Sequence, residues 1–213
     1  MYLFSRQARL ASGQMRGGIP WALGVCERAT QVAGLPISLF TQVFSPGLGT
    51  LAWTTFVPDL ASLEAADEKL MLEEDYLAAV DEGAAFLDGS GVDDLLFQVI
   101  HGAPDPERQV QYVSAVRASC ASGNLARGME VGVQIAQRAE EISGVPTMFV
   151  ANATGTYGGV AWITGFDSVS ALEAGESALM ADPSWVEMID RDAAGVYAET
   201  PELTVQTVYR RLM

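Results

Sequence analysis

Positive charge is scarce in this sequence. Its 213 residues include 12 Lys and Arg against 27 Asp and Glu, which gives a formal net charge of −15. Such a balance repels phosphate backbones and anionic lipid head groups, so we expect neither nucleic acid nor a membrane surface as a partner. A hydrophobic fraction of 49% with 18% charged residues is ample for a folded core and excludes a disordered chain.

Residues with redox or metal chemistry are also few. The two cysteines, Cys26 and Cys120, form no CxxC pair and predict no disulfide framework, which fits a reducing cytoplasm. His101 is the only histidine, and no cluster of His, Cys, Asp and Glu has metal-ligand spacing, so no metal site is expected. The sequence also has no phosphate-binding loop and no Ser/His/Asp order for nucleophilic catalysis.

Long apolar helices are missing as well. Residues 35–58 and 145–166 carry no charge, but turn residues interrupt each stretch, as SPGLGT and TGTYGG. Two short apolar runs around a turn predict a β-hairpin rather than a membrane helix. The first residues show no basic segment followed by a long apolar one, so we expect no secretory signal and a cytoplasmic protein.

The sequence contains an internal repeat. Residues of the first half match residues 110 positions later in the second half. After the hairpin turn, where the second copy lacks one residue, the offset becomes 109. Chance does not keep so many identities in register across a single gap. The matches include Tyr2 with Tyr112, Gly34-x-Pro36 with Gly144-x-Pro146, Ala52-Trp53-x-Thr55 with Ala161-Trp162-x-Thr164, and Leu63-Glu64-Ala65 with Leu172-Glu173-Ala174.

Each copy shows the pattern of a ferredoxin-like unit, β-α-β-β-α-β. Apolar residues recur at helical spacing in the first helix, and Gly with Pro two residues later ends it. In the second copy the last helical region breaks at Asp182-Pro183, an N-cap followed by a first-turn proline. The expected ranges are 1–10, 15–33, 37–45 with 50–57, 60–86 and 95–100 in the first copy, and 110–120, 125–143, 147–154 with 159–166, 169–196 and 203–209 in the second.

These elements predict an α+β fold of two tandem repeats, residues 1–100 and 110–213, joined by a polar, Pro-rich linker at 101–109. Both helices of a unit cover one face of its sheet, and the other face must also be covered. The sister copy is the simplest cover. We therefore expect an intrachain pseudo-dimeric α/β barrel, as a monomer or as a homodimer.

This pattern resembles the dimeric α/β-barrel superfamily, which includes antibiotic-biosynthesis-monooxygenase-like, haem-degrading and chlorite-dismutase-like proteins. The resemblance rests on the order of elements in each repeat, on Trp53 and Trp162, and on the sequence LEA followed by LM in the second helical region of each copy. It implies a cofactor-independent monooxygenase acting on an aromatic or polyketide-like substrate held between sheet and helices. In such chemistry the deprotonated substrate itself reacts with oxygen, and the protein supplies desolvation and orientation.

The resemblance also implies a site in which an Asn and a Trp hold the substrate. Asn152 and Trp162 are then the candidate catalytic residues, and Gln42, Trp53 and Tyr157 the candidate substrate-binding residues, with the second copy preferred. Each has a structural alternative. The tryptophans can be core residues, the amides can serve the neighbouring turns, and Tyr157 can be an exposed turn residue.

Two other functions stay open. The shortage of acid–base and metal-binding residues is compatible with a non-catalytic barrel that binds a small hydrophobic or aromatic molecule or assembles. Haem binding through His101 is the lesser alternative, because the chlorite-dismutase-like pattern places its ligand histidine in the second copy, where this chain has none. No cofactor is expected for the monooxygenase-like function.

Overall fold

The computed structural model describes residues 1–105, 107–108, 110–200 and 204–213. The chain is α+β, and its hydrogen-bonded strand order, β1-β3-β2-β8-β5-β7-β6-β4, is that of a closed barrel. The predicted fold class is therefore confirmed. The chain divides into two compact units: a first unit of residues 1–96 with 210–213, and a second unit of residues 97–209.

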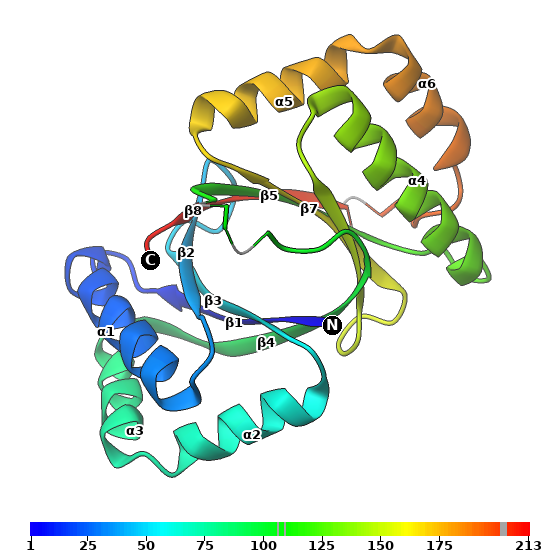
Figure 1. Cartoon of the computed structure of the whole chain (residues 1–213). Coiled ribbons are helices and arrows are strands. Elements are labelled where there is room, and N and C mark those ends of the chain that lie inside the picture. Colours follow the sequence, from blue (N-terminus) through cyan, green and yellow to red (C-terminus); the bar gives the residue numbers. More distant parts are fainter. Residues whose placement is uncertain (106, 109, 201–203) are drawn as a thin grey trace. The chain divides into compact units, whose positions relative to one another are not determined.

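In the first unit, β1, β3 and β2 form an antiparallel sheet with the helices on one face (Figure 1). The helix α1 ends at Gly34, whose φ of 70° is a left-handed conformation that glycine adopts readily, and its N–H donates to the Thr30 carbonyl at 3.0 Å. The elements are β1 (Tyr2–Leu10), α1 (Met15–Ala33), β2 (Ser38–Val43), β3 (Thr50–Val57), α2 (Leu60–Met71), α3 (Glu74–Asp81), the short 3₁₀ helix η1 (Glu82–Ala85) and β4 (Leu87–His101).

The second unit repeats this order with β5, β7 and β6 as its antiparallel sheet (Figure 1). The predicted break at Asp182 is confirmed, because its Oδ1 accepts from the N–H groups of Ser184 at 2.9 Å and Trp185 at 3.2 Å. The elements are β5 (Tyr112–Ser119), α4 (Leu125–Ser143), β6 (Thr147–Asn152), β7 (Gly159–Phe166), α5 (Val169–Ala181), α6 (Pro183–Asp192) and β8 (Val205–Arg211).

The last strand of each half runs from one unit into the other. The end of β4 belongs to the second unit, where Phe97 pairs with Asn152 and Val99 with Val150. The end of β8 and the residues after it, 210–213, belong to the first unit, where Leu212 and Met213 both donate backbone hydrogen bonds to the Leu39 carbonyl. The boundaries between the two units therefore fall inside β4 and β8.

The predicted helical region at 60–86 proves to be three pieces. A break falls at Leu72–Glu73, and β4 begins at Leu87, earlier than the expected 95. Glu73 is extended, with φ −95° and ψ 102°, and carries no glycine or proline signal that would announce it. The predicted start of the last strand at 203 lies outside the described residues.

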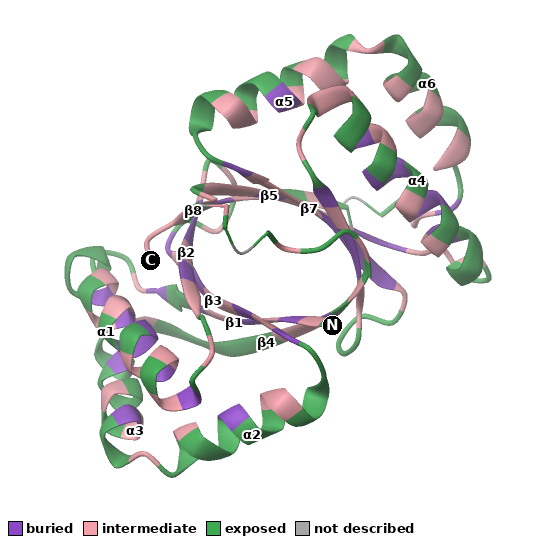
Figure 2. Cartoon of the chain, in the orientation of Figure 1, coloured by how far each residue is buried: buried purple, intermediate pink, exposed green. Residues whose placement is uncertain are grey.

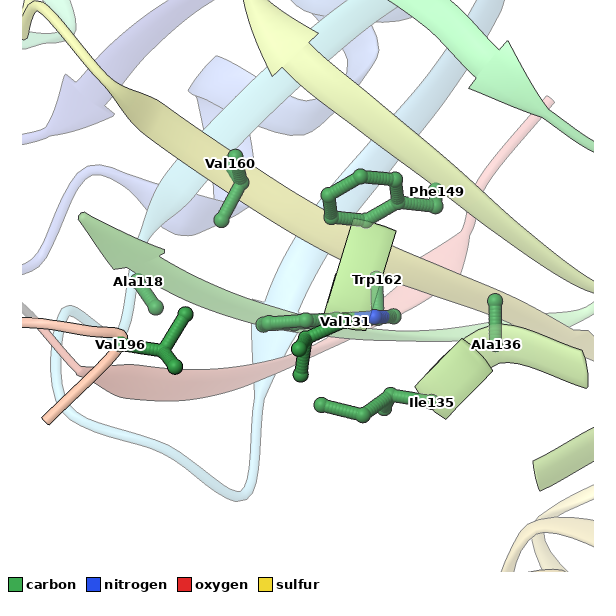
Figure 3. Packing of buried hydrophobic residues seen from close by; sticks show 8 residues of the cluster. All are labelled: Ala118, Val131, Ile135, Ala136, Phe149, Val160, Trp162 and Val196. Atoms are coloured by element: carbon green, nitrogen blue, oxygen red, sulfur yellow. The ribbon is translucent and has the colours of Figure 1, made fainter. Parts of the chain in front are cut away.

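Buried and exposed residues alternate along the helices of each unit (Figure 2), and the buried ones include Ala22 and Cys26 on α1 and Val131 and Ile135 on α4. Figure 3 shows the core of the second unit, in which residues from α4, β6 and β7 surround Trp162. The smaller core of the first unit contains Leu10, Ala22, Cys26, Leu39 and Leu51. No helix in the described part of the chain has the length and apolarity to cross a bilayer.

Cys26 is expected to be chemically inert in the folded protein. Its side chain has no exposed surface, its thiol donates to the Ile37 carbonyl at 3.5 Å, and burial raises its pKa to about 11. At pH 8 a thiol reagent such as 5,5′-dithiobis(2-nitrobenzoate) should modify Cys26 only at the rate of unfolding. Modification of Cys26 that is fast in buffer and no faster in denaturant contradicts this burial.

Candidate functional site

A cavity of about 710 Å³ lies in the first unit, between its sheet and its helices. This volume is within the usual range for small-molecule sites, roughly 300–1,000 Å³. Four aromatic side chains contribute to its walls: Phe4 on β1, Trp21 on α1, Trp53 on β3 and Tyr76 on α3. The remaining lining is largely aliphatic and includes Val25, Ala29, Leu35, Ile37, Leu63 and Leu70.

Trp53 is held in place by its neighbours on α1. Its Nε1 donates to the Ala22 carbonyl at 3.1 Å, and its ring meets that of Trp21 edge to face with the centroids 5.9 Å apart. A tryptophan with its polar atom satisfied presents the rest of its ring as a rigid apolar wall. Trp53 can therefore define one side of a site for a flat molecule.

Arg6 is the one cation among the described residues that line this cavity. Its Nε and Nη2 each donate to a carboxylate oxygen of Asp94 at 2.8 Å, and its guanidinium lies over the Phe4 ring at 5.6 Å. The hydrogen bonds to Asp94 raise the pKa of Arg6 above its ordinary value and outweigh the lowering by desolvation. Arg6 is thus a permanently charged group in a defined orientation.

Carboxylates outnumber that cation. Asp94 faces the cavity beside Arg6, and α2 contributes the exposed side chains of Glu64 and Asp67 at the rim. A hydroxyl is also present, but Thr55 already donates to the Pro36 carbonyl at 2.9 Å. The polar part of the lining is therefore acidic and grouped, whereas the walls are apolar.

Trp162, at the position that matches Trp53, lies inside the core of the second unit. It is 9% exposed, and its Nε1 donates to the Gly132 carbonyl at 2.8 Å. Phe149 and Tyr197 pack on its ring with centroid distances of 5.3 Å each. Because Trp53 makes the matching hydrogen bond to α1, both tryptophans attach a helix to their sheet, and the geometry favours a structural role for Trp162.

The two candidate amides serve the turns of their own hairpins. Gln42 Nε2 donates to the Pro46 carbonyl and to Ser45 Oγ, and Asn152 Nδ2 donates to the Thr156 carbonyl at 3.3 Å. Both contacts close a loop of the chain. The geometry thus agrees with the structural alternative for these residues, and neither lines the described cavity.

Tyr157 and His101 also lie away from the cavity. Tyr157 is 88% exposed in the turn between β6 and β7. His101 pairs with Phe149 at a register shift near the end of β4. Of the five predicted site residues, Trp53 is thus the one that the described structure places in the cavity wall.

The matching region of the second unit has different chemistry. Ser114, at the position of Phe4, donates to Glu176 Oε1 at 3.1 Å, and Gln206 Nε2 donates to both at 3.0 and 2.8 Å. Val116 stands where the first unit has Arg6. A closed polar network thus replaces the Phe4 ring, and an apolar side chain replaces the cation.

The lining residues that escaped the sequence-based prediction include Arg6, Tyr76 and Asp94. Arg6 had a signal, because it is a charged residue within the first strand and its match in the second copy is Val116. Tyr76 and Asp94 had none, because both lie in regions where the helix break and the strand start were not predicted.

Comparison with known proteins supports the fold. No family model matches the chain, and no curated protein matches it by sequence. Several solved structures match over its whole length. A protein of Fusobacterium nucleatum named “putative monooxygenase” is 6% identical with a TM-score of 0.71 and 92% of its own chain covered. An anthrone oxidase-like protein is 12% identical, with a TM-score of 0.65 and 91% covered.

A third structure, a heme-binding protein from Thermus thermophilus, is 13% identical with a TM-score of 0.52, and 91% of that chain is covered. Structural similarity at identities this low shows a shared fold but does not show a shared reaction. Together with the order of elements and strands described above, they show that this chain, a closed α/β barrel, shares its fold with these structures.

Proposed function

We propose that the cavity of the first unit binds a flat aromatic molecule and that the protein oxygenates it without a bound cofactor. The observation that carries this proposal is an apolar space of about 710 Å³ between sheet and helices, with the anchored ring of Trp53 as one wall. Aromatic walls suit a planar ligand because ring contacts add to the burial of apolar area.

The proposed reaction requires an electron-rich substrate with an acidic proton. Loss of that proton gives a carbanion or phenolate, which transfers electrons to O2, and one oxygen atom enters the ring system while the other leaves as water. Glu64 and Asp67 at the rim are the described carboxylates in position to accept the proton. The apolar walls exclude water, and Trp53 fixes the plane of the substrate.

Anthrone is a suitable probe, since two structures with this fold are named as a monooxygenase and as anthrone oxidase-like. Its oxidation balances as anthrone plus O2 giving anthraquinone plus water. Oxygen uptake should match anthraquinone formation one to one, at a rate above that of the protein-free solution.

The two matched tryptophans provide the test. Trp53→Leu and Trp162→Leu each remove a ring and one hydrogen bond to a helix carbonyl, but only the first changes the described cavity. We expect kcat/KM to fall by about tenfold in Trp53→Leu, the equivalent of one good aromatic contact. In Trp162→Leu, assayed at a temperature where both variants are folded, it should change less than about twofold. Equal losses would contradict a site in the first unit.

Binding without turnover is the second candidate function. The described lining contains no histidine and no cysteine, so the cavity has little acid–base equipment beyond carboxylates. Saturable binding of anthrone with no oxygen uptake above the protein-free rate would favour a ligand-binding barrel.

We further propose that the two halves descend from one duplicated unit and that the first kept the ligand site. The matched Trp53–Ala22 and Trp162–Gly132 hydrogen bonds support a common origin. The replacement of Arg6 by Val116 and of Phe4 by the hydrogen-bonded Ser114 supports the divergence.

A further inference from the structure

The helix α2 borders the cavity with the face that would otherwise pack on the sheet. Of its 12 residues, all described, Ala66 alone is buried. A helix with so few buried contacts is the kind of segment that moves relative to its surroundings. The α2 residues that line the cavity recur at helical spacing and include Leu60, Leu63, Glu64, Asp67 and Leu70.

The matching helix of the second unit, α5, is hydrogen-bonded to its sheet. Glu176 Oε1 accepts from Ser114 on β5 at 3.1 Å and from Gln206 on β8 at 2.8 Å. In the first copy, Asp67 stands at the position of Glu176 and Phe4 at that of Ser114. In the described ranges Asp67 accepts no hydrogen bond and forms no ion pair. The contact that fixes α5 is therefore missing from α2.

The joints after the two helices differ in the same way. The helix α5 passes to α6 at Asp182. Its side chain caps α6 through the N–H groups of Ser184 and Trp185 and pairs with Arg138 Nη2 at 3.4 Å. At the matching position Glu73 joins α2 to α3, is extended, and makes no capping hydrogen bond with its side chain. A joint without such contacts can absorb a change in backbone angles, so Glu73 is a suitable hinge.

Apolar side chains surround the opening of the cavity. Leu60 on α2, Val80 on α3 and Val92 on β4 line it, although each is exposed. Movement of α2 toward the sheet would remove part of this surface from water, which favours a closed position. Closure over an unfilled space would leave a void, whereas a ligand fills it. Closure should therefore depend on the ligand.

We propose that α2 is the lid of this cavity, which closes toward the sheet when a ligand enters, and that α5 stays fixed. The inference rests on the ligand site of the proposed function and adds its regulation. Closure would exclude water from the bound molecule, and the proposed oxygenation benefits from this exclusion.

Hydrogen exchange followed by mass spectrometry tests the mobility of the two helices. In the free protein the amides of α2 should exchange about tenfold faster than those of α5, after correction for sequence. Saturating 1-naphthol, a flat aromatic probe, should slow exchange in α2 by about tenfold and in α5 by less than about twofold.

Glu176→Ala tests what fixes α5. It removes the acceptor of the two hydrogen bonds to the sheet and does not line the cavity. Exchange in α5 should rise by about tenfold, the usual effect of losing hydrogen bonds to a charged group, and exchange in α2 should stay unchanged.

A distance measurement tests the direction of the movement. Spin labels are placed on Leu60→Cys and Val92→Cys, on two sides of the opening, in a protein that also carries Cys120→Ala to avoid labelling at that position. Electron paramagnetic resonance gives the distance between the labels, and quenching of tryptophan fluorescence confirms that 1-naphthol binds the labelled protein. The distance should shorten on binding.

The outcomes separate the two proposals. Failure of 1-naphthol to bind the unmodified protein overturns the site of the proposed function and this inference with it. Binding with an unchanged or longer distance between the labels overturns the lid alone. Equal exchange of α2 and α5 in the free protein also overturns it, and so does exchange in α5 that Glu176→Ala leaves unchanged.

Discussion

Replacing Trp162 by alanine is expected to lower the free energy of unfolding by about 3–5 kcal/mol, the usual loss for a large aromatic side chain in a core. Trp162 is 9% exposed and packs on Phe149 and Tyr197 (Figure 3). Its removal would leave a void between sheet and α4 and would also break the hydrogen bond to the Gly132 carbonyl. Urea unfolding followed by circular dichroism measures the loss.

Tyr157→Ala is the matched control. It also removes an aromatic side chain, but Tyr157 lies in a turn and is 88% exposed. Its effect should stay within about 0.5 kcal/mol. A loss below about 1 kcal/mol in Trp162→Ala would show that this ring is not part of a packed core and would reopen a ligand-binding role for it.

Adding one methyl group at Gly132 is expected to destabilise the protein, because forcing an extra carbon into a packed core costs about 1–3 kcal/mol, and more for a severe overlap. A Cβ at this position of α4 would overlap the ring of Phe149, which is fully buried. Alanine favours a helix over glycine by about 1 kcal/mol, and this gain only partly offsets the overlap. Thermal unfolding at equal protein concentration gives the difference.

Gly24 provides the control in the other helix. It lies on the exposed side of α1, and an added Cβ there has no atom within 4 Å. Gly24→Ala should therefore stabilise the protein by about 0.5–1 kcal/mol through helix propensity alone. Opposite signs for the two Gly→Ala changes support the packing of α4 on Phe149, whereas a gain in both would contradict it.

The order of the elements could be predicted because it depends on local signals. Turn residues in the charge-free stretches identified both hairpins, and Gly34 and Gly144 marked the ends of α1 and α4. The pairing at the ends of β4 and β8 had no local signal. It depends on which strand edge is available to Leu212 and to Phe97 after folding, and this is a property of the whole sheet.

The candidate site was harder to predict for a related reason. Trp53 and Trp162 occupy matching positions in the two repeats. The side chains packed around each ring determine that Trp53 lines a cavity and that Trp162 lies in a filled core. In the first unit Leu39 stands at the position that Phe149 occupies in the second. The larger Phe149 ring packs on Trp162, while Trp53 keeps one face on the open space.

The central claim, a ligand site in the first unit, is tested most directly by a crystal structure of the protein with 1-naphthol. We predict electron density for the ring system between the sheet and helices of the first unit, beside Trp53. Density for the ligand only in the second unit, with the first cavity filled by water alone, would contradict the account.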